Sequence, residues 1–131
     1  MPARKAGPRV ARRSGCPIAL TLDLLGDKWT LLVVRDLMFF GKRRFNELQA
    51  SQEGVPTNIL ADRLRRLEKG GLVRKAAYQR NPVRYEYLLT PKGSELILVL
   101  REIIAWGKRH LPGIGTPPPG FRNPTADRGA P

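Results

Sequence analysis

Apolar residues near the start of the chain recur at helical spacing. Ile18, Leu22 and Leu25 follow one another at intervals of four and three residues, so they share one face of a helix, and Pro17 suits its first turn. A glycine stands at the expected end of this helix. Asp27 is expected to be the N-cap of a second helix. The first half of that helix is apolar nearly all round, as expected of a helix enclosed by others.

Two shorter helical patterns follow, separated by a tight turn. A third helix is predicted over residues 45–51, and residues 52–55 form the turn. A fourth helix is predicted from Pro56 to a pair of glycines at positions 70 and 71. Its inward face carries three leucines at the spacing i, i+4, i+7: Leu60, Leu64 and Leu67. Two helices joined in this way are typical of a helix-turn-helix.

A hairpin and a long helix complete the pattern. Residues 72–78 and 84–89 are rich in strand formers, and residues 79–82 between them are turn residues. Thr90 and Pro91 are expected to cap a helix that continues to about residue 111. Its apolar stripe is too broad for one small core, and part of it is expected to face a second chain. The stripe comprises Leu96, Ile97, Val99, Leu100, Ile103, Ile104 and Trp106.

The order of these elements predicts an α+β fold that is mostly α. The predicted architecture is a winged helix-turn-helix with a two-stranded wing and a long C-terminal dimerisation helix. We expect one domain over residues 16–112, because 131 residues leave room for one modest core. A basic disordered arm over residues 1–15 and a Pro/Gly-rich disordered tail over residues 113–131 are expected on either side.

The net charge narrows the choice of partner. The chain has 24 Lys and Arg against 11 Asp and Glu, a formal charge of +13. Only five of the basic residues lie in residues 1–15, so the predicted domain is itself basic. Such an imbalance attracts phosphate polymers or anionic membranes. The arm is expected either to enter a minor groove or only to raise non-specific affinity for DNA.

Several classes of protein are not expected. No apolar run approaches the ~20 residues of a membrane span, and the short run after the arginine-rich start contains Thr21 and Asp23, unlike a signal peptide. One cysteine and one histidine cannot fill a four-ligand zinc site, and no catalytic set can be assembled around His110. We therefore expect a cytoplasmic protein that is not an enzyme, needs no cofactor or metal, and has no membrane partner.

The fourth predicted helix has the properties of a recognition helix. Thr57 and Asn58 lie in its first turn, which usually enters the major groove, and are the expected base contacts. Three arginines, which suit guanine or phosphate, follow in the same helix: Arg63, Arg65 and Arg66. The alternatives are a solvated basic face or an ion pair between Arg63 and a nearby acid. Asp62 is expected to point aside or to orient an arginine.

Basic residues also flank the predicted helix-turn-helix. Arg80 and Arg84 at the tip of the hairpin suit phosphate or minor-groove contacts. Lys42, Arg43 and Arg44 form a short link, or an edge strand, placed to bind backbone phosphates. Hairpin tips and links also collect charge simply because they are exposed. Double-stranded DNA is the expected partner, and a winged helix used for protein or RNA contact is the alternative.

The residues also match the pattern of a known family. The matching segments are residues 16–17 (CP), 25–30 (LGDKWT), 44–48 (RFNEL), 63–68 (RLRRLE), 71–73 (GLV), 82–87 (PVRYEY), 89–90 (LT) and 106–107 (WG). In this order they resemble the HxlR-type bacterial transcription regulators. The resemblance spans about residues 16–110 and implies a homodimeric winged helix-turn-helix protein that binds a pseudo-palindromic operator, mostly as a repressor and sometimes as an activator.

Cys16 is the residue with reactive chemistry. A thiol at a helix N-terminus beside Arg12 and Arg13 gains stabilisation of its thiolate. The resemblance implies redox or electrophile sensing, because the matching cysteine in HxlR-type proteins often senses oxidants, quinones or aldehydes. The alternative is a small thiol that packs near the dimer seam. A small-molecule effector stays unknown, since Trp29 and Trp106 suit core or interface better than a pocket.

Overall fold

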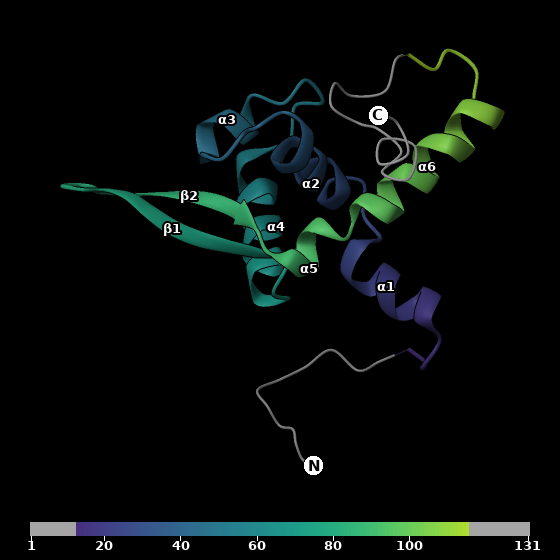
Figure 1. Ribbon diagram of the computed structural model, residues 1–131, viewed down its shortest axis with the longest axis horizontal. Coiled ribbons are helices and arrows are strands. Elements are labelled where there is room, and N and C mark those ends of the chain that lie inside the picture. Colours follow the sequence, from purple (N-terminus) through teal and green to yellow (C-terminus); the bar gives the residue numbers. More distant parts are fainter. Residues whose placement is uncertain (1–12, 116–131) are drawn as a thin grey trace, which may run out of the picture.

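The computed structural model describes residues 13–115 and has the predicted order of elements (Figure 1). The predicted arm, apart from residues 13–15, and the predicted tail from residue 116 lie outside the described residues. The elements are α1 (Pro17–Leu25), α2 (Thr30–Phe39), α3 (Phe45–Gln49), α4 (Thr57–Lys69), β1 (Val73–Arg80), β2 (Val83–Leu89), α5 (Pro91–Ser94) and α6 (Ile97–His110). The prediction of a mostly helical winged helix-turn-helix is confirmed.

The core lies where α2, α3, α4 and the base of the hairpin meet. The three leucines predicted on the inward face of α4 are all buried, with Leu60 and Leu67 fully so. They pack with Val34 from α2 and Leu48 from α3 in one cluster. The helical spacing of the leucines thus fixes which side of α4 faces the protein and which side is left outward.

The turn between α1 and α2 is held by Asp27. Its carboxylate accepts hydrogen bonds from the backbone N–H groups of Trp29, at 3.0 Å, and Thr30, at 3.2 Å. The Thr30 hydroxyl donates to the same carboxylate. Asp27 therefore binds free N–H groups at the start of α2, but the helix begins at Thr30 with Trp29 at the N-cap, two residues after the N-cap that the sequence predicted.

The wing is a two-stranded antiparallel sheet that leaves the body on the side away from α6 (Figure 1). Its register runs from Val73 opposite Leu89 to Arg80 opposite Val83, with an irregularity between Ala77 and Gln79. The strands reach further than predicted, because the ladder continues into the segment expected as the turn. The predicted edge strand at residues 42–44 is reduced to one ladder-like bond, from the Tyr87 N–H to the Arg43 carbonyl at 2.7 Å.

The prediction of one continuous helix after the wing is wrong. Thr90 caps α5 as expected, accepting a bond from the Gly93 N–H at 3.1 Å, but the chain turns at residues 95–96 before α6 begins. A Cβ on Gly93 would lie 2.0 Å from the carbonyl oxygen of Leu72. The close packing of α5 on the chain before β1 holds the short helix, and α6 begins at Ile97 after the two turn residues. The predicted third helix is also shorter than expected, ending at Gln49.

No helix within residues 13–115 is long and apolar enough to cross a membrane.

Candidate nucleic-acid interface

The outward face of α4 carries the residues predicted to contact bases. Thr57 and Asn58 are exposed in the first turn, and Asn58, Asp62 and Arg65 follow at i, i+4 and i+7 on the side opposite the buried leucines. The Thr57 hydroxyl accepts a hydrogen bond from Gln49 Nε2 at 2.5 Å. This bond joins α3 to the start of α4 across the turn, a contact that sequence reasoning missed.

Arg63 lies on the flank of α4 and is paired with acids. Its Nε donates to Asp27 Oδ2 at 2.8 Å, and a terminal nitrogen donates to Asp62 at 2.5 Å. The hydrogen bond to Asp27 raises the pKa of Arg63. Burial raises the pKa of Asp27, but hydrogen bonds from Arg63, Thr30 and the backbone of Trp29 outweigh it and lower that pKa to about 2. Of the two alternatives to DNA contact given above for Arg63, a solvated basic face and an ion pair with a nearby acid, the structure shows the ion pair.

Arg65 and Arg66 are less constrained. Their side chains are 70% and 44% exposed, and their nitrogens lie 3.5 and 3.8 Å from Asp62 oxygens. Exposed pairs at such distances stabilise a protein little. Arg65 and Arg66 therefore stay open to a ligand, and the arginine that Asp62 orients is Arg63, through their bond of 2.5 Å.

A groove between α3 and the wing gathers basic and aromatic side chains. The Arg44 guanidinium lies 3.8 Å from the centre of the Tyr78 ring, and Lys75 Nζ lies 4.7 Å from that of Tyr85. Arg84 lines the same groove. Asn46, Lys75, Tyr78 and Tyr85 were missed from the sequence. The basic and tyrosine residues within both strands are the signal that could have found Lys75, Tyr78 and Tyr85, whereas nothing in the sequence pattern marks Asn46 on α3.

The other predicted phosphate contacts have different surroundings. Lys42 points back toward the body, with its Nζ 3.7 Å from Asp36 Oδ2 and 6.0 Å from the centre of the Phe40 ring. Arg43 is exposed beside it. At the wing tip, Arg80 and Arg84 have no acidic partner among residues 13–115.

The helix-turn-helix turn is held by an ion-pair network that the sequence did not reveal. Arg35 on α2 binds Glu53 in the turn through two bonds of 2.7 and 2.8 Å, and binds Asp36 at 2.8 Å. The bond to Glu53 raises the pKa of Arg35. Arg35 and Ser51 in turn lower the pKa of Glu53 to about 2. The turn is therefore fixed against α2.

A glutamate fixes the link before α3. Glu47 Oε1 accepts bonds from the backbone N–H groups of Arg43, at 2.9 Å, and Arg44, at 3.0 Å. These bonds lower the pKa of Glu47. The link therefore has a defined backbone, from which the basic side chains of Arg43 and Arg44 project.

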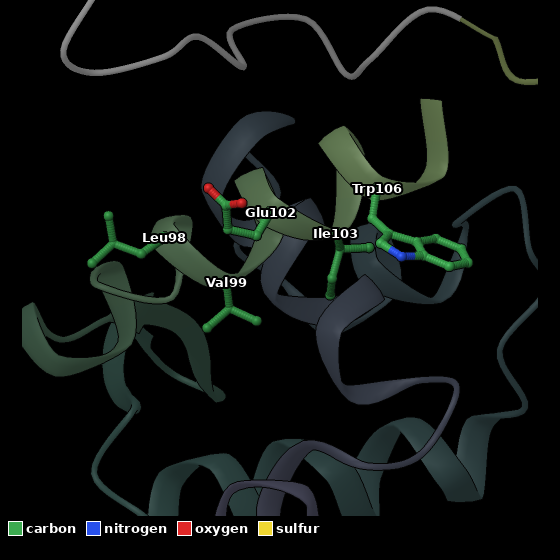
Figure 2. A pocket seen from close by; sticks show the side chains of 5 residues that line it. All are labelled: Leu98, Val99, Glu102, Ile103 and Trp106. Carbon is green, nitrogen blue, oxygen red and sulfur yellow. The ribbon is translucent and has the colours of Figure 1, made fainter. Parts of the chain in front are cut away.

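The stripe predicted on the last helix divides between core and surface. Leu100 is buried, whereas Ile103 and Trp106 are each more than half exposed, as is Leu98, which the predicted stripe did not include. Figure 2 shows the resulting hollow along α6, lined by Leu98, Val99, Glu102, Ile103 and Trp106. On α1, Ile18 is 71% exposed and Leu22 52% exposed. Trp29 instead packs against the core, so the two tryptophans do not share a pocket.

Cys16 is exposed and precedes the first residue of α1. Its backbone N–H donates to Ser14 Oγ at 3.2 Å. Arg13, expected to stabilise the thiolate, binds Asp23 at 2.8 Å and the Ala19 carbonyl at 3.1 Å, while Arg12 lies outside the described residues. Within residues 13–115 no three His, Cys, Asp or Glu side chains are grouped to hold a metal.

Comparison with known proteins agrees with this arrangement. Residues 24–114 match the model of the family described as HxlR-like helix-turn-helix. The HTH-type transcriptional regulator Rv3095 of Mycobacterium tuberculosis is 39% identical over 114 residues, which are 87% of this chain and 71% of the relative. The regulator YdeP of Bacillus subtilis is 34% identical over 96 residues, 73% of this chain and 74% of its own length.

Solved structures share the fold at similar identity. The reduced form of the transcriptional regulator YodB from B. subtilis superposes with a TM-score of 0.63 and 31% identity, covering 78% of this chain and 100% of YodB. The redox regulator HypR in its oxidised form superposes with a TM-score of 0.61 and 34% identity, covering 72% of this chain and 97% of HypR. These relatives are regulators of transcription and not enzymes. The chain belongs to the HxlR-like helix-turn-helix family of DNA-binding transcriptional regulators.

Proposed function

We propose that this protein represses transcription by binding a pseudo-palindromic operator as a homodimer. The observation that carries the proposal is the outward face of α4, where Asn58 and Arg65 stand exposed on the side opposite the buried leucines. A helix held by an apolar stripe, with long polar side chains on its other side, is what major-groove recognition requires. Because DNA is the partner, the cytoplasm is the proposed place of action.

Base contacts are assigned to the first turn of α4. Asn58 can bind an adenine at two points, and Thr57 is held in place by Gln49. Arg65 and Arg66, further along the helix, can reach guanine or phosphate. Replacement of Asn58 by Ala is expected to relax sequence preference while leaving the salt dependence of binding unchanged.

Phosphate contacts are assigned to the wing and the link. Arg80 and Arg84 form no ion pair in the described part of the chain, and the Arg44 guanidinium lies over the Tyr78 ring, which leaves its charge in place. Arg43 and Lys42 extend this basic surface toward the body of the protein. These contacts are expected to position the protein and to carry little sequence information.

Dimerisation is assigned to the apolar surfaces of α1 and α6. Ile18, Leu22, Ile103 and Trp106 are each more than half exposed, an arrangement that marks an interaction surface. In a symmetric dimer the two copies of α4 would lie about 34 Å apart, or a multiple of it, to enter successive major grooves. Sedimentation of the purified protein tests this assembly, and a monomer would contradict it.

Regulation is assigned to Cys16. The thiol is exposed, and the similar proteins YodB and HypR have structures of reduced and oxidised forms. Since the chain has one cysteine, oxidation by diamide would join the Cys16 thiols of two subunits as a disulfide, with both hydrogens passing to the diamide. A Cys16→Ser protein is expected to keep its operator affinity in diamide, whereas the wild type loses it. Equal behaviour of the two proteins would reject this role.

Selection of bound sequences from a random duplex pool at physiological salt tests the central proposal. A two-fold symmetric motif is expected. The affinity for that motif should fall by orders of magnitude between roughly 50 and 200 mM salt, because several phosphates are contacted. No enrichment from a folded protein, or binding that ignores salt, would instead favour a protein-contact role.

A further inference from the structure

The ion pair between Asp27 and Arg63 joins two elements that are distant in sequence. Asp27 lies in the turn between α1 and α2, and Arg63 lies in the middle of α4. Their bond of 2.8 Å is the shortest direct polar contact between this turn and α4, and the two side chains are only 24% and 18% exposed. A pair with this degree of shielding holds its geometry better than a fully exposed one.

Asp27 is itself fixed by the body of the protein. The same carboxylate accepts bonds from the N–H groups of Trp29 and Thr30 and from the Thr30 hydroxyl, and Thr30 is buried. One carboxylate thus caps α2 and at the same time binds α4. Any displacement of α4 along its axis would stretch the bond to Arg63 while the capping bonds stay in place.

Arg63 does not share the outward face of α4. Asn58, Asp62 and Arg65 follow one another on the side opposite the core, whereas Arg63 comes one residue after Asp62 and turns toward the body to reach Asp27. We propose that Arg63 is a positioning residue, which holds α4 through Asp27 so that Asn58 and Arg65 meet the DNA, and that it makes no phosphate contact itself. This inference rests on the proposed DNA binding.

Two readouts separate this role from a phosphate contact. The first readout is the salt slope, which is the slope of log affinity against log salt concentration. An arginine that binds phosphate contributes about 0.9 to this slope per contact, whereas loss of a positioning residue lowers the affinity and leaves the slope unchanged. In addition, removal of the Asp27 charge makes the protein more positive. Simple electrostatics would then strengthen DNA binding, whereas loss of positioning would weaken it.

The experiment compares Asp27→Asn, Arg63→Gln and the double variant with wild type on the selected operator over a salt series. Asparagine can keep the capping bonds to α2, so Asp27→Asn removes mainly the ion pair. We expect each single variant to bind about tenfold more weakly, the double variant to bind no more weakly than either, and all slopes to equal that of wild type. Arg65→Gln is the matched control, with a slope that falls by about 0.9 for each phosphate that Arg65 binds in the wild type.

Each other result has a definite meaning. A lower slope for Arg63→Gln, or unchanged or tighter binding by Asp27→Asn, would overturn the inference while the proposed function stands. Should Asp27→Asn fail to fold, the slopes of Arg63→Gln and Arg65→Gln still decide between the two roles. Absence of operator binding by the wild type would instead overturn the proposed function, and the positioning role with it.

Discussion

The basic side chains of the helix-turn-helix and those of the wing differ in their partners. Arg35 and Arg63 in the helical part are each bound to two carboxylates. Around the wing, Arg44 from the link before α3 and Lys75 from β1 lie over tyrosine rings and form no ion pair in the described part of the chain. The net charge of a DNA-binding domain therefore overstates the charge that is available to DNA, because part of it holds the fold together.

Burial explains why the two regions differ. A guanidinium taken partly out of water needs an opposite charge, so arginines that cross the helical body pair with Asp and Glu. The wing is exposed along most of β1 and at the tip-proximal end of β2, where its arginines stand in solvent. A tyrosine ring restricts a cation without neutralising it, which leaves the charge available to phosphate.

Loss of Arg35 should have the largest effect on stability. Asp36 is 2% exposed and would lose its two bonds from Arg35, which leaves Lys42 Nζ, at 3.7 Å, as the remaining cation beside its buried charge. We expect Arg35→Met to lower the free energy of unfolding by about 3 kcal/mol, measured by urea denaturation. Arg74→Met, on an exposed position of β1, is the control and should change it by less than about 0.5 kcal/mol. Equal effects would remove the distinction between the two regions.

Acid should act on the helical part through Asp27 and Glu53. Both groups have a pKa near 2 in the folded protein, below their ordinary values of 3.8 and 4.5, so the unfolded chain binds their protons first. The stability that they contribute is complete above about pH 5 and is lost as the pH falls toward 2. A double Asp27→Asn, Glu53→Gln variant should show a flatter curve over this window in urea titrations at successive pH values. A curve parallel to that of wild type would contradict the assignment.

Loss of the wing arginines should affect binding and not folding. Arg80→Ala and Arg84→Ala are each expected to weaken binding to all duplexes about tenfold and to lower the salt slope by about 0.9 for each phosphate that the arginine binds. Their urea midpoints should match that of wild type. Asn58→Ala provides the contrast, since it should change which sequences are bound. A wing variant that altered sequence preference would show that the wing reads bases.

Local pattern predicted most of the fold. The leucines of α4, and the strand formers and turn residues of the hairpin, depend on near neighbours in the chain, and both elements were found from sequence. The break before α6 was not, because it depends on the contact of Gly93 with the backbone of Leu72, which sequence periodicity does not encode.

The residues of the candidate site likewise fall into two groups: those that the local sequence pattern placed and those whose contacts depend on tertiary structure. The exposed positions of Asn58 and Arg65 followed from helical spacing. The partner of Arg63 is 36 residues away in sequence, and only the packing of α4 against the turn after α1 selects Asp27 over other acids. The stack of Arg44 on Tyr78 likewise joins two elements through tertiary structure alone.

The contact of Arg44 with the Tyr78 ring is expected to give the smallest effect, and it tests whether a ring near the wing leaves the charge of a cation available to DNA. If the ring holds the guanidinium without reducing its charge, Tyr78→Ala should weaken DNA binding only about two- to fivefold, the effect of one exposed cation–π contact. The salt slope should stay unchanged, because Arg44 still binds its phosphate. Tyr78→Phe retains the ring and should bind as wild type in the same titration. Weaker binding by the Phe variant as well would mean that the hydroxyl of Tyr78, and not its ring, contacts the DNA, and the wing would then contribute polar bonds of its own beside its charges.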